Sequence, residues 1–309
     1  RGGRYVRASE RTRTLVMHVP VLAEEVIKLL DPKENENFID CTLGNGGHAT
    51  AILEKTGPRG KLLGIDWDEE SCKTTAARLK SSGLSGRATL VQDNFANMRE
   101  IATREKFHRI HGILFDLGFS TSQMEDAERG FSFQKDGPLD MRYSFMNPVT
   151  AEKIVNYRSR PELERILKIY GEERFWRQIT DAIIYERGAR QITRTRQLVS
   201  IIEGAVPKRY AGGRIHAATR TFQALRIATN NEPENLEKGL GAALSLVAAK
   251  GRIAAISFHS LEDRIVKRFF ARTPSLRPIT KKPGMASLRE VRCNPKARSA
   301  KLRVAVKIV

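Results

Sequence analysis

The 309-residue sequence has only three cysteines, Cys41, Cys72 and Cys293, and they are far apart with no paired Cys or Cys/His spacing. This pattern predicts neither a disulfide framework nor a zinc site, and it favours a reducing compartment. A run of eighteen uncharged apolar residues is also missing, which argues against a membrane-spanning helix. We therefore expect a soluble protein that binds no metal.

Acidic residues are scarce as well. The chain has 35 Asp and Glu against 54 Lys and Arg, a formal net charge of +19. Such a basic surface attracts polyanions, so we expect a nucleic-acid partner, with a merely solubilising surface as the alternative. Residues 1–16 form a predicted basic extension, either a phosphate-binding arm or the remnant of a targeting segment. The expected compartment is a bacterial cytoplasm, with a mitochondrion or plastid as the alternative.

Apolar periodicity predicts strands that alternate with helices. Strands are expected at 37–41, 61–66, 88–93, 111–116, 251–258 and 301–309, and helices at 21–30, 48–55, 69–80 and 260–271. This alternation predicts an α/β fold with a parallel sheet covered on both faces. Residues 123–226 instead show only helical spacing, so they predict an all-helical insertion, and 17–122 and 227–309 together complete the sheet domain.

The stretch "FIDCTLGNGGHATAIL" is the first functional signal. An apolar run stops at Asp40, passes through three glycines and restarts as a helix, while Asp66 ends the next strand twenty residues after Gly46. This pattern suits a dinucleotide, whose pyrophosphate meets the helix, and it equally suits S-adenosylmethionine, with the acid on the ribose in both cases. A tight strand-to-helix turn without a ligand is the third interpretation.

"FDLGFSTSQ" places Asp116 and small polar residues, Ser120 among them, at the carboxyl end of a buried strand. An acid there can accept hydrogen bonds from an amine and align its lone pair with a methyl donor, although it can also simply cap the next segment. His259 and Ser260 follow another strand in the same way, with helix capping by Ser260 as the alternative. Asp116, Ser120 and His259 are the predicted catalytic residues.

Longer motifs then resemble a known family, the bacterial 16S ribosomal RNA cytosine-N4 methyltransferases called RsmH, formerly MraW. The motifs are "HVPVLAEEV", "DCTLGNGGHATAIL", "DLGFSTSQMEDAERGFSFQKDGPLDMR", "GEERFWRQITDAI", "RIHAATRTFQALRIATNNE", "GRIAAISFHSLEDRIVKRFF" and "NPKARSAKLR", in family order over about 17–303. The resemblance implies a Rossmann-like domain with a helical insertion. It also implies that S-adenosylmethionine is used to methylate N4 of a cytidine in the decoding region of small-subunit rRNA.

Motif by motif, the resemblance also implies cofactor contacts. They fall on Gly46, Gly47, His48, Asp66, Phe95, Asp116 and Gln123. The sequence departs from the family at Phe119, where a small aliphatic residue is usual, at Tyr143 and Ser144 in "DMRYS", and at Ala217 in "HAATR". These departures affect the target side more than the cofactor loop. Phe119 either stacks on a displaced base or belongs to the core.

Residues 264–309 contain fourteen Lys or Arg and one acid, Glu290. With an rRNA substrate we expect phosphate contacts there, and a solvated loop is the alternative. The predicted RNA-binding residues are Arg289, Arg292, Lys296, Arg298 and Lys301, together with Arg220, which is expected to share a helical face with His216. The expected partners are small-subunit rRNA and its assembly particle, for a monomer or homodimer that binds no membrane.

Two other functions compete with this hypothesis. An NAD-dependent oxidoreductase would share the glycine loop and the acid, but it would have no need for so basic a chain. A ribosome-assembly factor without activity would keep the fold as an RNA-binding module and would bind both ligands without transferring a methyl group.

Overall fold

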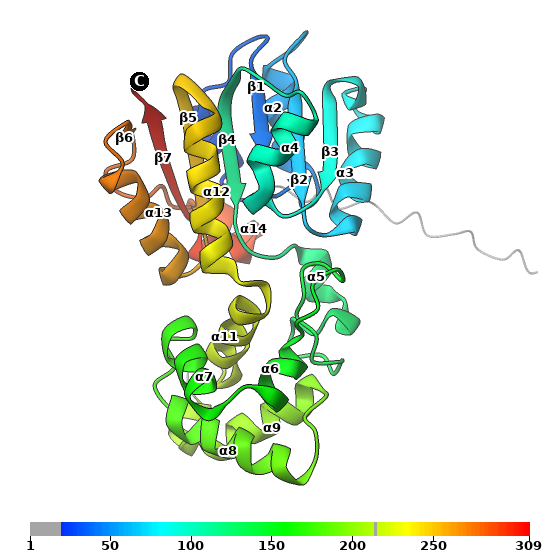
Figure 1. Cartoon of the computed structure of the whole chain (residues 1–309), viewed down its shortest axis with the longest axis vertical. Coiled ribbons are helices and arrows are strands. Elements are labelled where there is room, and N and C mark those ends of the chain that lie inside the picture. Colours follow the sequence, from blue (N-terminus) through cyan, green and yellow to red (C-terminus); the bar gives the residue numbers. More distant parts are fainter. Residues whose placement is uncertain (1–19, 213–214) are drawn as a thin grey trace, which may run out of the picture.

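The computed structural model describes residues 20–212 and 215–309, so the predicted extension over residues 1–16 lies outside the described part. A seven-stranded sheet in the order β3-β2-β1-β4-β5-β7-β6 forms the upper part of the molecule in Figure 1. The strands are β1 (Asn37–Asp40), β2 (Leu62–Asp66), β3 (Ala88–Gln92), β4 (Ile110–Asp116), β5 (Val247–Ser257), β6 (Leu276–Pro278) and β7 (Lys301–Lys307).

Helices cover both faces of this sheet. On one face pack α1 (Ala23–Leu30), α2 (Gly47–Lys55) and α3 (Glu69–Ser81), and on the other α4 (Met98–Arg104), α12 (Glu232–Leu246) and α13 (Ser260–Arg272). Their apolar stripes, with Ile52 on one side and Leu240 on the other, bury the two faces in separate cores. The α/β class and the Rossmann-like layering are confirmed. Sequence periodicity did not indicate α12 or β6.

The expectation of a parallel sheet is wrong at one edge. Strands β1 to β5 pair in parallel, but β7 runs antiparallel to both neighbours, with Ala254 opposite Val304 and Arg277 opposite Val306. A parallel strand needs a long crossover, and α13 provides one between β5 and β6. Between β6 and β7 the chain has only α14 (Leu288–Cys293) and the short helix η5 (Pro295–Ser299). The segment before β7 therefore stays at the carboxyl edge of the sheet.

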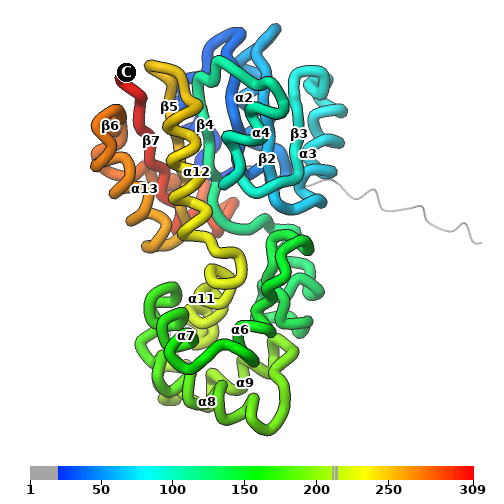
Figure 2. The backbone as a smooth tube through the Cα atoms, in the orientation of Figure 1, coloured from blue at the N-terminus to red at the C-terminus, as the bar shows by residue number. Residues whose placement is uncertain are grey.

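The remaining helices form the lower part of the molecule in Figures 1 and 2. They are α5 (Thr121–Glu125), α6 (Ala151–Tyr157), α7 (Arg160–Arg165), the π-helix η4 (Ile166–Tyr170), α8 (Trp176–Ala189), α9 (Thr195–Ala205), α10 (Lys208–Ala211) and α11 (Ala218–Asn230). This part has its own core, which includes Leu163, Ile183 and Leu225. Within the described ranges, none of the helices has both the length and the apolar character needed to span a bilayer.

Short 3-10 turns complete the connections. They are η1 (Ser85–Arg87), η2 (Phe95–Asn97) and η3 (Ala127–Arg129). The predicted domain limits at 122/123 and 226/227 stay a prediction, but α11 runs through the second one without a break. The helical direction changes at Asn231, whose φ of 49° lies in the left-handed region between α11 and α12. We propose Asn231 as the return point to the sheet domain.

Candidate active site

A cavity of about 390 Å³ opens where the carboxyl ends of β1, β2, β4 and β5 meet the helical part. The sheet contributes residues such as Thr42, Asp66 and Asp116, and the helical part contributes Tyr143 and Arg226. Its volume falls within the range of roughly 300–1,000 Å³ that is common for small-molecule sites. Open α/β sheets bind ligands at this edge, so the cavity is the candidate active site.

The glycine turn forms one wall. Gly46 has a φ of 73°, and a Cβ at this position would lie 2.9 Å from the side chain of Thr75. Both facts require glycine here. The N–H of Gly46 donates to the carbonyl of Leu43 at 2.8 Å, and α2 begins at the next residue, Gly47. The turn therefore brings bare backbone to the cavity at Gly44 and Gly47.

Asp66 faces this turn from the end of β2. Its Oδ2 accepts from the N–H of Gly44 at 2.9 Å, and its Oδ1 accepts from the N–H of Asp68 at 2.8 Å. Burial raises the pKa of Asp66 to about 6, although both backbone hydrogen bonds act to lower it. Ser71 also forms a side-chain hydrogen bond to Asp66, so one of the four acceptor positions of the carboxylate remains for a ligand hydroxyl. This is the arrangement expected of a ribose-binding acid.

Phe95 and Gln123 line the same end of the cavity. The ring of Phe95 meets the edge of Phe115 with centroids 5.5 Å apart, and it packs so closely that a Cβ on Gly239 would lie 2.7 Å from it. Gln123 is 5% exposed and donates from Nε2 to Asp68 at 3.0 Å. Phe95 can therefore offer its ring to a ligand, whereas Gln123 already uses its amide within the protein.

Asp116, at the end of β4, lies in a group of buried ionisable side chains. Its Oδ2 is 3.6 Å from Nε2 of His48, and its Oδ1 has no hydrogen-bond partner among the described residues. Asp40 is fully buried, and burial raises its pKa to about 7. Burial alone would lower the pKa of His48, but Asp116 and then Asp40 outweigh it and raise that pKa. Asp116 thus brings a partly exposed carboxylate to the cavity, with a histidine beside it.

Phe119, in the loop after β4, is the first of three stacked aromatic rings. Phe119 stacks on Phe131 with centroids 5.5 Å apart, and Phe131 stacks on Tyr143 at 5.7 Å. Two of the sequence departures, Phe119 and Tyr143, are therefore the ends of one structural unit. Ser120 caps α5 by accepting from the N–H of Gln123 at 3.2 Å, and Gln123 accepts in return from the N–H of Ser120. Its predicted catalytic role stays a prediction.

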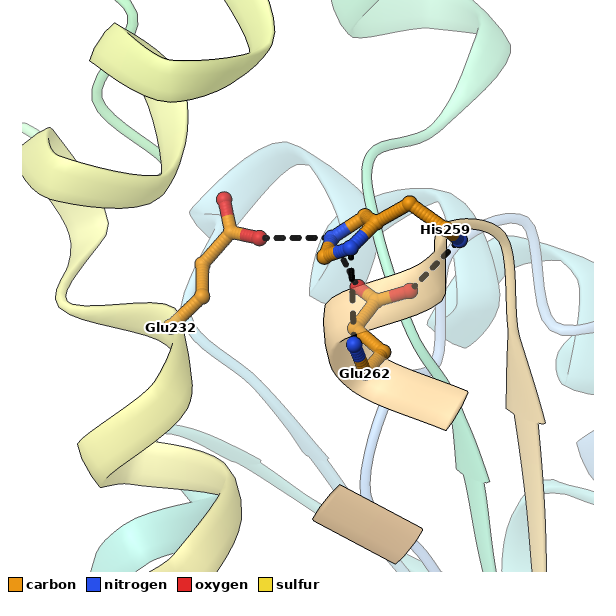
Figure 3. A group of neighbouring side chains, drawn as sticks. All are labelled: Glu232, His259 and Glu262. Atoms are coloured by element: carbon orange, nitrogen blue, oxygen red, sulfur yellow. Dashed lines mark hydrogen bonds and ion pairs between the residues drawn. The ribbon is translucent and has the colours of Figure 1, made fainter. Parts of the chain in front are cut away.

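His259 belongs to a charged cluster where α12 approaches α13 (Figure 3). Its Nε2 lies 3.1 Å from Glu262 and 3.8 Å from Glu232, and Arg226 pairs with both oxygens of Glu232 at 2.8 and 2.9 Å. Burial alone would lower the pKa of His259, but Glu262 and Glu232 raise it to about 9. The backbone N–H of His259 donates to Glu262 at 3.3 Å, so the N-cap position of α13 that was expected for Ser260 belongs to His259.

Glu232, His259 and Glu262 are also close enough together to hold a metal ion, with ligand atoms all within 4.8 Å. The cluster is nevertheless balanced as it stands. Two carboxylates face the guanidinium of Arg226 and an imidazole that its neighbours keep protonated. An added cation would meet both positive groups, so we assign no metal here.

The predicted RNA-binding residues fall into two groups. Arg289, Arg292 and Arg298 are exposed, and Lys301 is half-buried with an ion pair to Asp263 at 3.5 Å. Lys296, by contrast, lines the cavity. In α11, Arg220 donates to the carbonyl of Glu172 at 3.1 Å. The expectation that Arg220 and His216 share a helical face was wrong, because His216 precedes α11. The ring of His216 stacks on Phe133 with centroids 4.6 Å apart.

Sequence reasoning missed four residues of this site: Asp40, Tyr143 as a polar partner, Arg226 and Glu232. Tyr143 donates its hydroxyl to Glu232 at 3.0 Å, across 89 positions of sequence. Arg226 and Glu232 lie six residues apart on two helices, so no single helical spacing relates them. For Asp40 a signal was available, because a carboxylate that ends an apolar strand before a glycine turn is placed beside any ligand there.

The sheet is Rossmann-like, with a glycine turn after β1 and acids at the carboxyl ends of β2 and β4, an arrangement that S-adenosylmethionine-dependent methyltransferases share. The bare turn, the acceptor capacity of Asp66 and the ring of Phe95 fit that cofactor. The model of the MraW methylase family matches residues 15–308. The chain therefore belongs to the MraW methylase family.

Curated relatives agree with this assignment over nearly the whole chain. The protein is 43% identical to "Ribosomal RNA small subunit methyltransferase H" of Symbiobacterium thermophilum, an alignment that covers 94% of this chain and 96% of the relative. It is 46% identical to the protein of the same name from Dehalococcoides mccartyi, with 94% and 87% covered. For the protein of that name from Geobacter sulfurreducens the identity is 45%, with 94% and 99% covered.

Proposed function

We propose that this protein methylates N4 of a cytidine in the decoding region of small-subunit rRNA. The names of its relatives support the rRNA substrate, and the net charge of +19 suits a polyanion. The observation that carries the proposal is the carboxylate of Asp116 in the cavity wall, with its side chain 25% exposed. A partly exposed carboxylate there can accept a hydrogen bond from a donor that enters the cavity, and an exocyclic amine is such a donor.

S-adenosylmethionine, when bound, supplies a methyl group on a sulfonium sulfur. The chain would supply the placement: Asp66 would accept hydrogen bonds from the ribose hydroxyls, Phe95 would lie against the adenine, and the turn at Gly46 would let the cofactor approach the backbone at Gly44 and Gly47. Asp116 accepts a hydrogen bond from the amine and so aligns the nitrogen lone pair for in-line attack. Asp116 can also take the proton that the amine loses, and Nε2 of His48 lies 3.6 Å from its Oδ2.

The rRNA backbone would be bound outside the cavity. The exposed Arg289, Arg292 and Arg298 precede β7 at the same edge of the sheet as the cavity. Lysine and arginine contacts to phosphates position a protein on RNA without reading its sequence. An assembly particle as the substrate form, and a monomeric or homodimeric state, are parts of the same proposal. The named relatives are bacterial, so we propose a bacterial cytoplasm, and they give the organelle alternative no support.

The test is methyl transfer from labelled S-adenosylmethionine to small ribosomal subunits from cells that lack the endogenous activity. The modified nucleoside is then identified by mass spectrometry. We expect the label in N4-methylcytidine, and more of it in subunits than in free rRNA. Cofactor binding without any label in correctly assembled subunits would contradict the proposal and favour a factor without activity.

We expect Asp66→Asn to weaken cofactor binding by about 10-fold to 100-fold, because a hydrogen bond to a charged group contributes about 1.5–3 kcal/mol. The pKa of Asp66 is raised to about 6, so its carboxylate is charged above that pH and protonated below it. Affinity of the wild type should therefore fall as the pH drops from 7 to 5. Calorimetric titration with S-adenosylhomocysteine measures both effects.

The pH dependence has its own control. Asp66→Asn should lose most of the change between pH 7 and 5, and any remainder reports Asp40, whose pKa burial raises to about 7. Asp93→Asn, an acid beyond the end of β3 that bonds to Asn94 and Asn97, should bind the cofactor like the wild type. If Asp66→Asn bound as tightly as the wild type, the ribose assignment would be wrong.

A further inference from the structure

Lys296 occupies an unusual place for a basic residue. Because β7 runs antiparallel, η5 lies at the carboxyl edge and brings Lys296 into the cavity wall. Its Nζ lies 5.3 Å from the ring centroid of Phe119. Burial lowers the pKa of Lys296 below its ordinary value, and the negative charges of Glu125 and Asp116 offset this only in part. No hydrogen bond or ion pair of this ammonium is found among residues 20–212 and 215–309. Lys296 therefore has unused donor capacity inside the pocket.

A second cation lies near the same ring, but its charge is already paired. The guanidinium carbon of Arg226 is 5.1 Å from the centroid of Phe119. Its Nε and Nη2 both donate to Glu232, however, and that pair is nearly fully buried, with side chains 11% exposed. Arg226 is thus neutralised where it stands. Of these two cations, Lys296 is the one that has no ion pair among the described residues.

The strand order separates a cofactor side from a target side. Asp66 ends β2 and Phe95 follows β3, which lie on one side of β1, whereas Asp116 ends β4 on the other side. Lys296 enters beyond β5, before β7. Asp116 therefore lies between the cofactor residues and the pair formed by Phe119 and Lys296. That pair faces the position of the methyl acceptor.

We propose that Asp116, Phe119 and Lys296 together select cytosine as the methyl acceptor. Asp116 accepts from the N4 amine, the ring of Phe119 lies against the base, and Lys296 donates to N3 in the middle of the pairing edge or to O2 at its other end. Uracil has an oxygen acceptor in place of the amine, so it would leave Asp116 without a donor and bring two acceptors together. The inference rests on the proposed function and deepens it from a substrate class to the residues that read the base.

The experiment compares Lys296→Met with the wild type on subunits that lack the methyl group. We expect kcat/KM for subunits to fall at least 10-fold, because the lost hydrogen bond involves a charged donor. The dissociation constant of S-adenosylhomocysteine should stay within 2-fold, and the melting temperature should stay within about 2 °C of the wild type. The ratio between wild type and variant should not change between 50 and 200 mM salt, because a base carbonyl releases no counterions. Lys296→Arg should recover part of the activity.

Arg298→Met is the matched control, two residues away in η5 and exposed. As a phosphate contact it should lose several-fold in kcat/KM at low salt, with a shallower salt dependence than the wild type. Phe119→Leu, which introduces a small aliphatic residue, should lower kcat/KM at least 5-fold without a salt effect, because base stacking on an aromatic ring contributes to binding.

Each contrary result has a distinct meaning. A Lys296→Met variant as active as the wild type would overturn the proposal. Weaker cofactor binding would instead assign Lys296 to the carboxylate of the cofactor, and a salt profile like that of Arg298→Met would make it a phosphate contact. Both would overturn base selection. If the wild type itself left subunits unmodified, the proposed function would fail, and that outcome is visible before any variant is compared.

Discussion

Replacing Asp116 by asparagine is expected to lower kcat by about 100-fold to 10,000-fold, the range typical of a positioned acid or base. The N–H of Asp116 donates to the hydroxyl of Thr42 at 2.6 Å, so the backbone should hold its place in the variant. The carboxamide keeps the shape of the side chain, but it loses the charge and turns one acceptor into a donor that opposes the target amine. Single-turnover methyl transfer to subunits measures the effect without interference from product release.

The control for this variant is Asp126→Asn. Asp126 is exposed, ten residues further on, and caps η3 by accepting from the N–H of Glu128 at 2.9 Å, which asparagine can also do. It should keep activity within 2-fold of the wild type. For Asp116→Asn, the dissociation constant of S-adenosylhomocysteine should change by only a few-fold. A large loss of cofactor affinity with a normal kcat would make Asp116 a cofactor residue rather than a catalytic one.

Sequence periodicity predicted the strands and helices whose burial pattern is set by residues close to one another in the sequence. In β4 an unbroken apolar run ends at Asp116, and such a run is the mark of a strand covered on both faces. The direction of β7 was not accessible in this way. Its pattern is the same whether it runs with β5 or against it, and the choice depends on how the chain returns after β6.

The same distinction explains which site residues were found. Gly46, Asp66 and Asp116 follow strands directly, so the rule that parallel strands end at one edge brings them together from sequence. Lys296 was expected on an RNA-facing loop, and only the reversal of β7 places it in the cavity. Arg226 and Glu232 read as ordinary polar helix residues, because the left-handed turn at Asn231 that aligns them is not evident from spacing.

The charged cluster between the two parts of the molecule leads to the second large effect. Glu232→Leu should lower the free energy of unfolding by about 3–5 kcal/mol, because it leaves Arg226 buried without its partner. Burial alone would raise the pKa of Glu232, but Arg226 and His259 bring it down to about 2, so its charge is present at every ordinary pH. Chemical denaturation monitored by tryptophan fluorescence measures the loss, and Trp67 beside the cavity reports the region directly.

The double variant Arg226→Met/Glu232→Leu separates an unpaired charge from a general loss of packing. With both partners apolar, most of the lost stability should return, because the remaining costs are the hydrogen bond from Tyr143 and the interaction of Glu232 with His259. Glu237→Gln, exposed on the same helix, should change stability by less than about 0.5 kcal/mol. If the double variant were as unstable as Glu232→Leu alone, the cluster would hold the two parts together through Glu232, His259 and Glu262 rather than by pairing Arg226. Activity distinguishes that outcome further, because a loosened α12 would also displace Phe95 through Gly239 and weaken cofactor binding.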